Sequence, residues 1–212
     1  MKLYHYVHCP FCIRVRMVLS YLKLSYESIV LPYDDEKTPL ELAGKKMLPI
    51  MEMEGKVLNE SLEIISLIDK ENKLKTKESI AKYDEIEPLL NEMGSNIHSL
   101  AMPYFIWTPE FDQNSRQYFQ KKKEVKRGPF KELVHNREKF ETALMHTLEE
   151  NKDLFQKDFN HHALELNDIL IAAHMWGMYI VPEFQYPEPI HRYLQKVKAH
   201  CDFEYHGDYW RL

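Results

Sequence analysis

Two cysteines enclose a proline and a phenylalanine in the stretch HCPFC (residues 8–12), and this C-P-F-C motif constrains the fold more than any other feature. The residues before the motif alternate between apolar and polar side chains, as in a β-strand. The residues after it are rich in apolar side chains, as in a buried α-helix. The sequence therefore predicts a strand that leads into a helix at the cysteines.

The junction itself favours redox chemistry. Pro10 suits the first position of a helix, where its missing N–H would have no partner in any case. Cys9 then lies at the helix N-terminus, where free N–H groups and the helix dipole lower the pKa of a thiol. Cys12 follows on the same helical face, within reach for a disulfide. Arg16 is either a further positive charge on that face or an ordinary surface arginine.

Strand and helix patterns alternate through the first third of the chain in the order β-α-β-α-β-β-α. A C-x-x-C motif beside a βαβ pattern is typical of thioredoxin-like redox proteins. Glu54 and Gly55 are typical of a hairpin turn between the last two strands, and Gly44 is typical of a helix end. The expected elements are strands at residues 2–7, 25–32, 48–53 and 56–60, and helices at residues 10–24, 38–44 and 61–72.

The second part of the chain has almost no strand pattern. Residues 70–79 are polar and are expected to form a linker. Helices are expected at residues 80–107, 111–126, 129–151, 167–181 and 189–200. We therefore predict two domains, an α/β thioredoxin-fold domain over residues 1–72 and an all-α domain over residues 79–212.

Composition excludes several classes of protein. A net charge of −5 does not fit a nucleic-acid-binding protein, and the basic run at residues 121–127 is read as a solvated helix face. The longest apolar stretch, residues 169–181, is too short to cross a membrane and predicts a buried helix. Strand-like sequence from Lys2 and three cysteines in all lead us to expect a reducing, cytoplasmic location.

A metal site is not expected. A zinc site needs four ligands, and beyond the C-x-x-C motif only Cys201 and the adjacent His8 are candidates. The other histidines, including His161, His162 and His174, do not have ligand spacing. Cys201 is expected to be an inert, partly buried thiol.

Three motifs together resemble a known family. The stretches HCPFC, MLPI (residues 47–50) and NES (residues 59–61), followed by a helical second half, resemble the bacterial glutaredoxin 2 family, glutaredoxins with a glutathione-transferase-like (GST-like) architecture. The resemblance covers nearly the whole chain and is closer over residues 1–70. Two departures are Phe11 in place of the usual tyrosine, and Glu165 in place of a hydroxyl residue that caps a helix. Asn167 is the alternative cap, with Asp168 in the first helical turn.

The resemblance implies a glutathione site. A cis bond before Pro49 would turn the backbone of Leu48 towards the cysteinyl unit of glutathione, which could pair with it like an added strand. Ser61 at a helix N-terminus would bind the γ-glutamyl carboxylate, and Glu60 would bind its ammonium group. Candidates for the glycine carboxylate are Lys45 and Lys46. The implied glutathione-binding residues are Cys9, Pro10, Phe11, Leu48, Pro49, Glu60 and Ser61.

By this resemblance we expect a glutathione-dependent thiol-disulfide oxidoreductase, with Cys9 and Cys12 as the catalytic residues and glutathione as the co-substrate. Its expected partners are disulfide-containing or glutathionylated proteins, without nucleic acid or membrane, and the chain is expected to be a monomer. Two alternatives stay open. One is a cysteine-type glutathione transferase or dehydroascorbate reductase, and the other is a transferase-like protein that binds a regulatory partner without catalysis.

Overall fold

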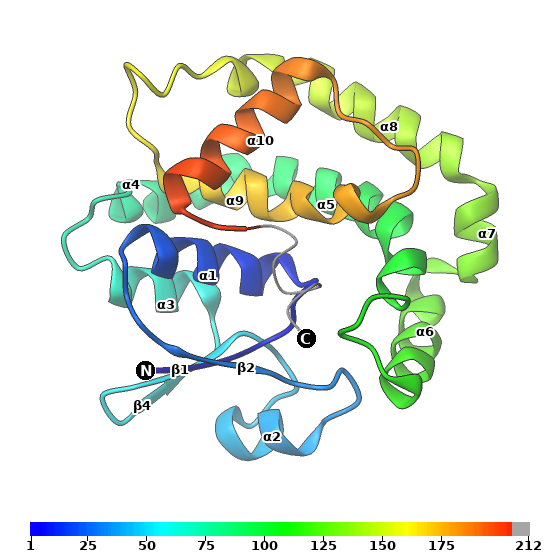
Figure 1. The fold of residues 1–212 in the computed structure, drawn as a ribbon, viewed down its shortest axis with the longest axis horizontal. Helices are drawn as coiled ribbons and strands as arrows, with labels where there is room; N and C mark the ends of the chain where they lie inside the picture. The colour runs from blue at the N-terminus through cyan, green and yellow to red at the C-terminus, as the bar shows by residue number, and fades with distance from the viewer. Residues whose placement is uncertain (205–212) are drawn as a thin grey trace.

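The computed structural model describes residues 1–204 and places a small mixed sheet and its helices beside a larger group of helices (Figure 1). The first part has the predicted β-α-β-α-β-β-α order. This order, followed by helices alone in the described part of the chain, confirms the predicted fold class. Its elements are β1 (Lys2–His5), α1 (Pro10–Tyr21), β2 (Glu27–Val30), α2 (Lys37–Ala43), β3 (Ile50–Met53), β4 (Lys56–Leu58) and α3 (Ser61–Ile68).

The sheet has the strand order β2-β1-β3-β4. Strand β1 pairs in parallel with β2, where Leu3 lies opposite Ser28, and antiparallel with β3, where Leu3 lies opposite Met51. The predicted hairpin connects β3 to β4, and both Glu54 and Gly55 have positive φ, at 52° and 76°. Helices α1 and α3 lie on one side of the sheet and α2 on the other (Figure 1). Helices α1 and α3 therefore lie between the sheet and the helices of the second part of the chain (Figure 1).

The remaining described residues form helices of very different lengths. Among residues 1–204, no helix is both long enough and apolar enough to cross a membrane. The elements are α4 (Thr76–Ala81), α5 (Tyr83–Phe105), α6 (Gln113–Arg127), α7 (Phe130–His135), α8 (Arg137–Glu150), η1 (Lys152–Gln156), α9 (Leu166–Met175), η2 (Trp176–Ile180) and α10 (Glu188–Cys201).

Three helices that were expected to be continuous are broken. The one expected at residues 80–107 is divided at Lys82, since α4 ends at Ala81 and α5 begins at Tyr83. The predicted helix at residues 129–151 is interrupted at Asn136, whose backbone N–H and side-chain amide both donate to the Glu132 carbonyl, at 2.9 and 2.8 Å. This side chain ends α7 by competing for the helical hydrogen bond. The predicted helix at residues 167–181 changes to the 3₁₀ form at Trp176. There Gly177 packs against Phe105, and an added Cβ would lie 2.9 Å from that ring.

The apolar run is buried, as predicted, because α9 packs on both α5 and α1. Its start corrects one expectation. Glu165, not Asn167, is the N-cap, and its backbone N–H donates to the Asp168 carboxylate at 2.8 Å. Asn167 therefore lies inside the first turn.

The segment expected to be a polar linker is held firmly in place. Asp69 is buried, and its carboxylate accepts from the N–H of Lys73 (2.8 Å), the N–H of Leu74 (3.1 Å) and the hydroxyl of Thr76 (2.6 Å). Leu74 is fully buried, and its carbonyl accepts from the Leu166 N–H at 2.8 Å. The polar residues of this segment therefore form hydrogen bonds within the fold, and the segment is not a free linker. The boundary between the two domains stays a prediction.

We expect Asp69→Ala to lower the free energy of unfolding by about 2–4 kcal/mol, because three donors, two of them from buried residues, lose their acceptor. The measurement is urea unfolding followed by circular dichroism. Glu71→Ala is the matched control, since Glu71 is exposed and makes only a surface ion pair with Lys73. Similar losses in both variants would contradict the structural role given to Asp69.

Candidate active site

Cys9 lies where the sequence predicts it, at the N-cap of α1 with Pro10 directly after it. Its backbone is extended (φ −80°, ψ 122°), and its carbonyl accepts from the N–H groups of Cys12 and Ile13 at 3.0 and 2.9 Å. The side chain of Cys9 is partly exposed, whereas Cys12 is completely buried. One thiol of the motif is therefore open to a substrate and the other is shielded.

The two thiols differ strongly in acidity. The pKa of Cys9 is lowered to about 6, chiefly by a hydrogen bond from the Cys12 side chain and further by His8 and the N–H groups of Cys12 and Phe11. The pKa of Cys12 is raised, first by burial and then by the neighbouring Cys9. The Tyr6 N–H also donates to the Cys12 sulfur at 3.4 Å. At neutral pH, Cys9 is therefore a thiolate and Cys12 a protonated donor.

Arg14 is an arginine that acts on the cysteines. Arg14 is buried, lies 4.7 Å from the centroid of the Phe11 ring and interacts electrostatically with both thiols. Arg16 is not a surface arginine: it is buried and packs over the Phe203 ring, 5.1 Å from its centroid. The sequence analysis missed Arg14, although its spacing of three residues from Phe11 on a helix was a usable signal.

Glu110, between α5 and α6, was also missed. Its carboxylate, whose side chain is only 1% exposed, accepts from the N–H groups of Val7 and His8 at 2.8 and 3.1 Å. It also lies 2.9 Å from Nδ1 of the His8 ring. A single residue from the helical part thus holds the loop that leads into Cys9.

The residues implied for glutathione occupy three segments around α1. The peptide bond between Leu48 and Pro49 is cis, as predicted, and Leu48 is buried. Ser61 is buried at the start of α3, where its Oγ accepts from Nε of Arg14 at 2.9 Å and also from Nη2. The Arg14 side chain also forms a hydrogen bond with Tyr83. The buried guanidinium is thus a cationic donor at the N-terminus of α3.

The charged candidates have other partners in the structure. Glu60 is exposed and forms an ion pair with Lys45 at 3.5 Å. Lys46 donates to the Tyr33 carbonyl at 2.8 Å and lies 3.6 Å from Glu36. Lys45 therefore lies beside the Ser61 end of the site, whereas Lys46, which follows α2, is held against the loop after β2.

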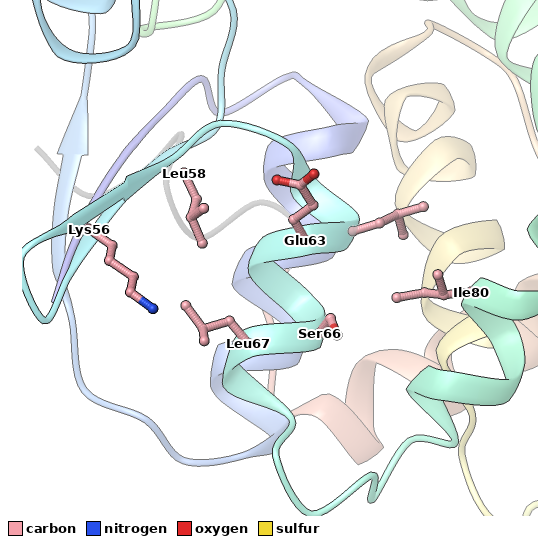
Figure 2. Close-up of a pocket in the computed structure, with 7 residues that line it drawn as sticks. Lys56, Leu58, Glu63, Ser66, Leu67 and Ile80 are labelled. Carbon is pink, nitrogen blue, oxygen red and sulfur yellow. The ribbon is translucent and has the colours of Figure 1, made fainter.

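Features elsewhere do not add to the thiol site. Cys201 is fully buried, and burial raises its pKa to about 12. Within residues 1–204, no three His, Cys, Asp or Glu side chains form a group that could hold a metal ion. A cavity of about 470 Å³, the outer cavity, lies between β4, α3 and α4 (Figure 2), and neither cysteine of the motif lines it. It is lined by Lys56, Leu58, Leu62, Glu63, Ser66, Leu67 and Ile80.

Comparison with known families gives two adjoining matches. The family described as "Glutaredoxin 2, C terminal domain" matches residues 85–206. The family described as "Glutathione S-transferase, N-terminal domain" matches residues 3–76. The first match alone covers more than half of the chain.

Individual proteins support the same relationship. Glutaredoxin 2 of Escherichia coli (strain K12) is 34% identical over 142 residues, which are 63% of this chain and 64% of that protein. The crystal structure of Salmonella typhimurium glutaredoxin 2 in complex with glutathione has a TM-score of 0.81 and 27% identity, and covers 96% of this chain and 95% of that one. A glutathione S-transferase from Ceriporiopsis subvermispora, at 14% identity and a TM-score of 0.79, covers 100% of this chain and 98% of its own and shares the fold.

We expect the thiolate absorbance of the native protein to titrate with a midpoint near pH 6. Replacing Cys12 with alanine should raise this midpoint by about one to two pH units, because a hydrogen bond to a charged group contributes about 1.5–3 kcal/mol. Cys12→Ser keeps a donor and should titrate close to the native protein. A native midpoint above about 8, near that of a free thiol, would contradict the assignment.

Proposed function

Because this chain belongs to the glutaredoxin 2 family, we propose that it is a glutathione-dependent thiol-disulfide oxidoreductase. Its proposed substrates are protein disulfides and protein–glutathione mixed disulfides. The observation that carries the proposal is the pair of thiols in the C-P-F-C motif, one partly exposed with a lowered pKa and one buried with a raised pKa.

Reduction of a mixed disulfide needs only Cys9. Its thiolate attacks the glutathionyl sulfur, a new S–S bond forms to glutathione, and the substrate cysteine leaves as a thiolate. A glutathione thiolate then attacks the glutathionyl sulfur of this intermediate. The products are glutathione disulfide and the regenerated Cys9 thiolate.

Reduction of a protein disulfide also uses Cys12. After Cys9 forms a mixed disulfide with the substrate, the Cys9 sulfur no longer carries negative charge, and one cause of the raised pKa of Cys12 disappears. Cys12 then loses its proton and attacks Cys9, which releases the reduced substrate and leaves a Cys9–Cys12 disulfide. Two glutathione molecules reduce this disulfide and are oxidised to glutathione disulfide.

Glutathione is proposed to lie between the loop at Leu48 and the start of α3. Arg14 supports this placement, because its buried guanidinium donates to Ser61 and brings positive charge to the start of α3. Since Ser61 Oγ already accepts from Arg14, its own proton is available for a carboxylate. The N–H groups at the start of α3 also favour an anion there. Glu60 is proposed to bind the ammonium of the same γ-glutamyl unit, with Pro10 and Phe11 lining the sulfur end.

Variants of the two cysteines test the reaction. Cys9→Ser should abolish turnover of a protein–glutathione mixed disulfide, because the hydroxyl is a poor nucleophile. Cys12→Ser should retain it, because glutathione resolves the intermediate. The measurement is glutathione-coupled reduction, with conjugation of glutathione to an electrophile assayed in parallel. Loss of activity in Cys12→Ser with activity retained in Cys9→Ser would reverse the roles, and conjugation without reduction would favour a transferase.

Ser61→Ala tests the glutathione site. It should weaken the apparent affinity for glutathione by about 10- to 150-fold, because an interaction with a charged group contributes about 1.5–3 kcal/mol. Ser66→Ala is the matched control, since Ser66 lies on the same helix but lines the outer cavity (Figure 2). Free cysteine as reductant should respond to neither change, because it lacks the γ-glutamyl group. Equal losses with both reductants would contradict the placement.

A further inference from the structure

A second cavity opens directly beside the C-P-F-C motif. It has a volume of about 330 Å³ and lies between the start of α1 and helices α5, α6 and α9. The Phe11 ring, which is 40% exposed, forms one wall and packs edge-on against His174 with ring centroids 5.7 Å apart. The polar side chains that line the cavity are Asn91, Ser95, His98, Lys126, Arg127 and His174.

The positive charge of this cavity is not neutralised. Lys126 and Arg127 line it together with no carboxylate, and neither forms an ion pair within the part of the chain that the structure describes. Nη1 of Arg127 donates to the Ser95 carbonyl (2.9 Å) and to the Ser99 hydroxyl (3.1 Å), which orient the guanidinium without opposing its charge. A cationic cavity is notable in a chain whose net charge is −5.

The charged surface continues from the cavity to the reactive sulfur. Lys123 lies one helical turn before Arg127 on α6 and interacts electrostatically with Cys9. Helix α6 lies across from the N-terminal end of α1 (Figure 1). Its ammonium lies 5.4 Å from the centroid of the Phe119 ring. The basic run expected to be a solvated helix face thus has two sides. Lys123 and Arg127 are half-buried and face the site. Lys121 and Lys126 are exposed, and of these two only Lys126 lines the cavity.

The two histidines supply hydrogen-bonding groups rather than charge. Burial lowers the pKa of His174 to about 4, and burial together with the charge of Arg127 lowers the pKa of His98. Nδ1 of His174 lies 2.9 Å from the Leu170 carbonyl. At neutral pH the cavity therefore combines two permanent cations with neutral imidazoles, an arrangement that suits carboxylates.

The geometry points to this cavity as the subsite for the thiol-bearing half of the substrate, selective for peptides with acidic residues beside the disulfide. This inference rests on the proposed function. When the Cys9 thiolate attacks the glutathionyl sulfur, the bond from that sulfur to the substrate breaks and its electron pair stays on the substrate sulfur. The departing thiolate and adjacent carboxylates would then share the positive field of Lys123, Lys126 and Arg127.

Two glutathionylated peptides that differ only in flanking residues, aspartate in one and lysine in the other, test the selectivity. With glutathione saturating, kcat/KM should be roughly tenfold higher for the acidic peptide, and the ratio should fall as salt is added. Lys126→Glu should remove or reverse the ratio. Lys121→Glu makes the same charge change at an exposed position of α6 that does not line the cavity, and it should leave the ratio unchanged.

A second measurement does not depend on turnover. Cys9 is alkylated with iodoacetate, which carries a carboxylate, and with the neutral iodoacetamide, and the ratio of the two rates is compared among the same three proteins. The ratio should fall roughly tenfold in Lys126→Glu and stay unchanged in Lys121→Glu. The native protein could show this preference for iodoacetate, lost in Lys126→Glu, and still reduce neither peptide. In that case the cationic subsite stands and the proposed function fails.

Two outcomes would overturn the inference while leaving the proposed function intact. One is equal turnover of the acidic and basic peptides by the native protein. The other is an equal loss on both peptides in Lys126→Glu, which would show that the cavity binds a carboxylate of glutathione itself.

Discussion

The burial of α1 between two layers is the constraint on which the rest of the structure depends. Its side chains pack on α3 beside the sheet and on α9 and α10 from the helical part. Val15, Met17 and Val18 are completely buried, and each such apolar side chain contributes about 1.5–3 kcal/mol. The N-terminus of α1, and with it Cys9, therefore has a fixed position that neither layer could define alone.

The helical part contributes to the site as well as to the core. Glu110 reaches into the loop before Cys9 and satisfies two backbone N–H groups there, and Lys123 brings a positive charge to the sulfur from α6. The α/β part contributes Arg14 and Ser61. The chemistry at Cys9 is thus controlled by residues that come from both parts of the chain.

Local patterns predict local features of this protein well. The C-P-F-C motif, Gly44 and the Glu54–Gly55 turn all lie at the predicted ends of elements, because each depends on the backbone preferences of a few adjacent residues. Glu110 was missed because its partners lie more than 100 positions away, and no local pattern marks such a contact. The buried face of the basic run was missed for the same reason, since periodicity identifies a polar helix but not what lies opposite it.

The difference in burial among the cysteines has a practical consequence for studies in solution. Cys12 and Cys201 are fully buried, so the native protein presents one sulfur, Cys9, to a bulky thiol-specific dye. A fluorescent or spin label can therefore be attached at a single known position without removing any natural cysteine. Unfolding exposes all three sulfurs, so the number of dye molecules bound per chain rises from one to three. This number therefore measures the fraction of unfolded molecules in a mixture.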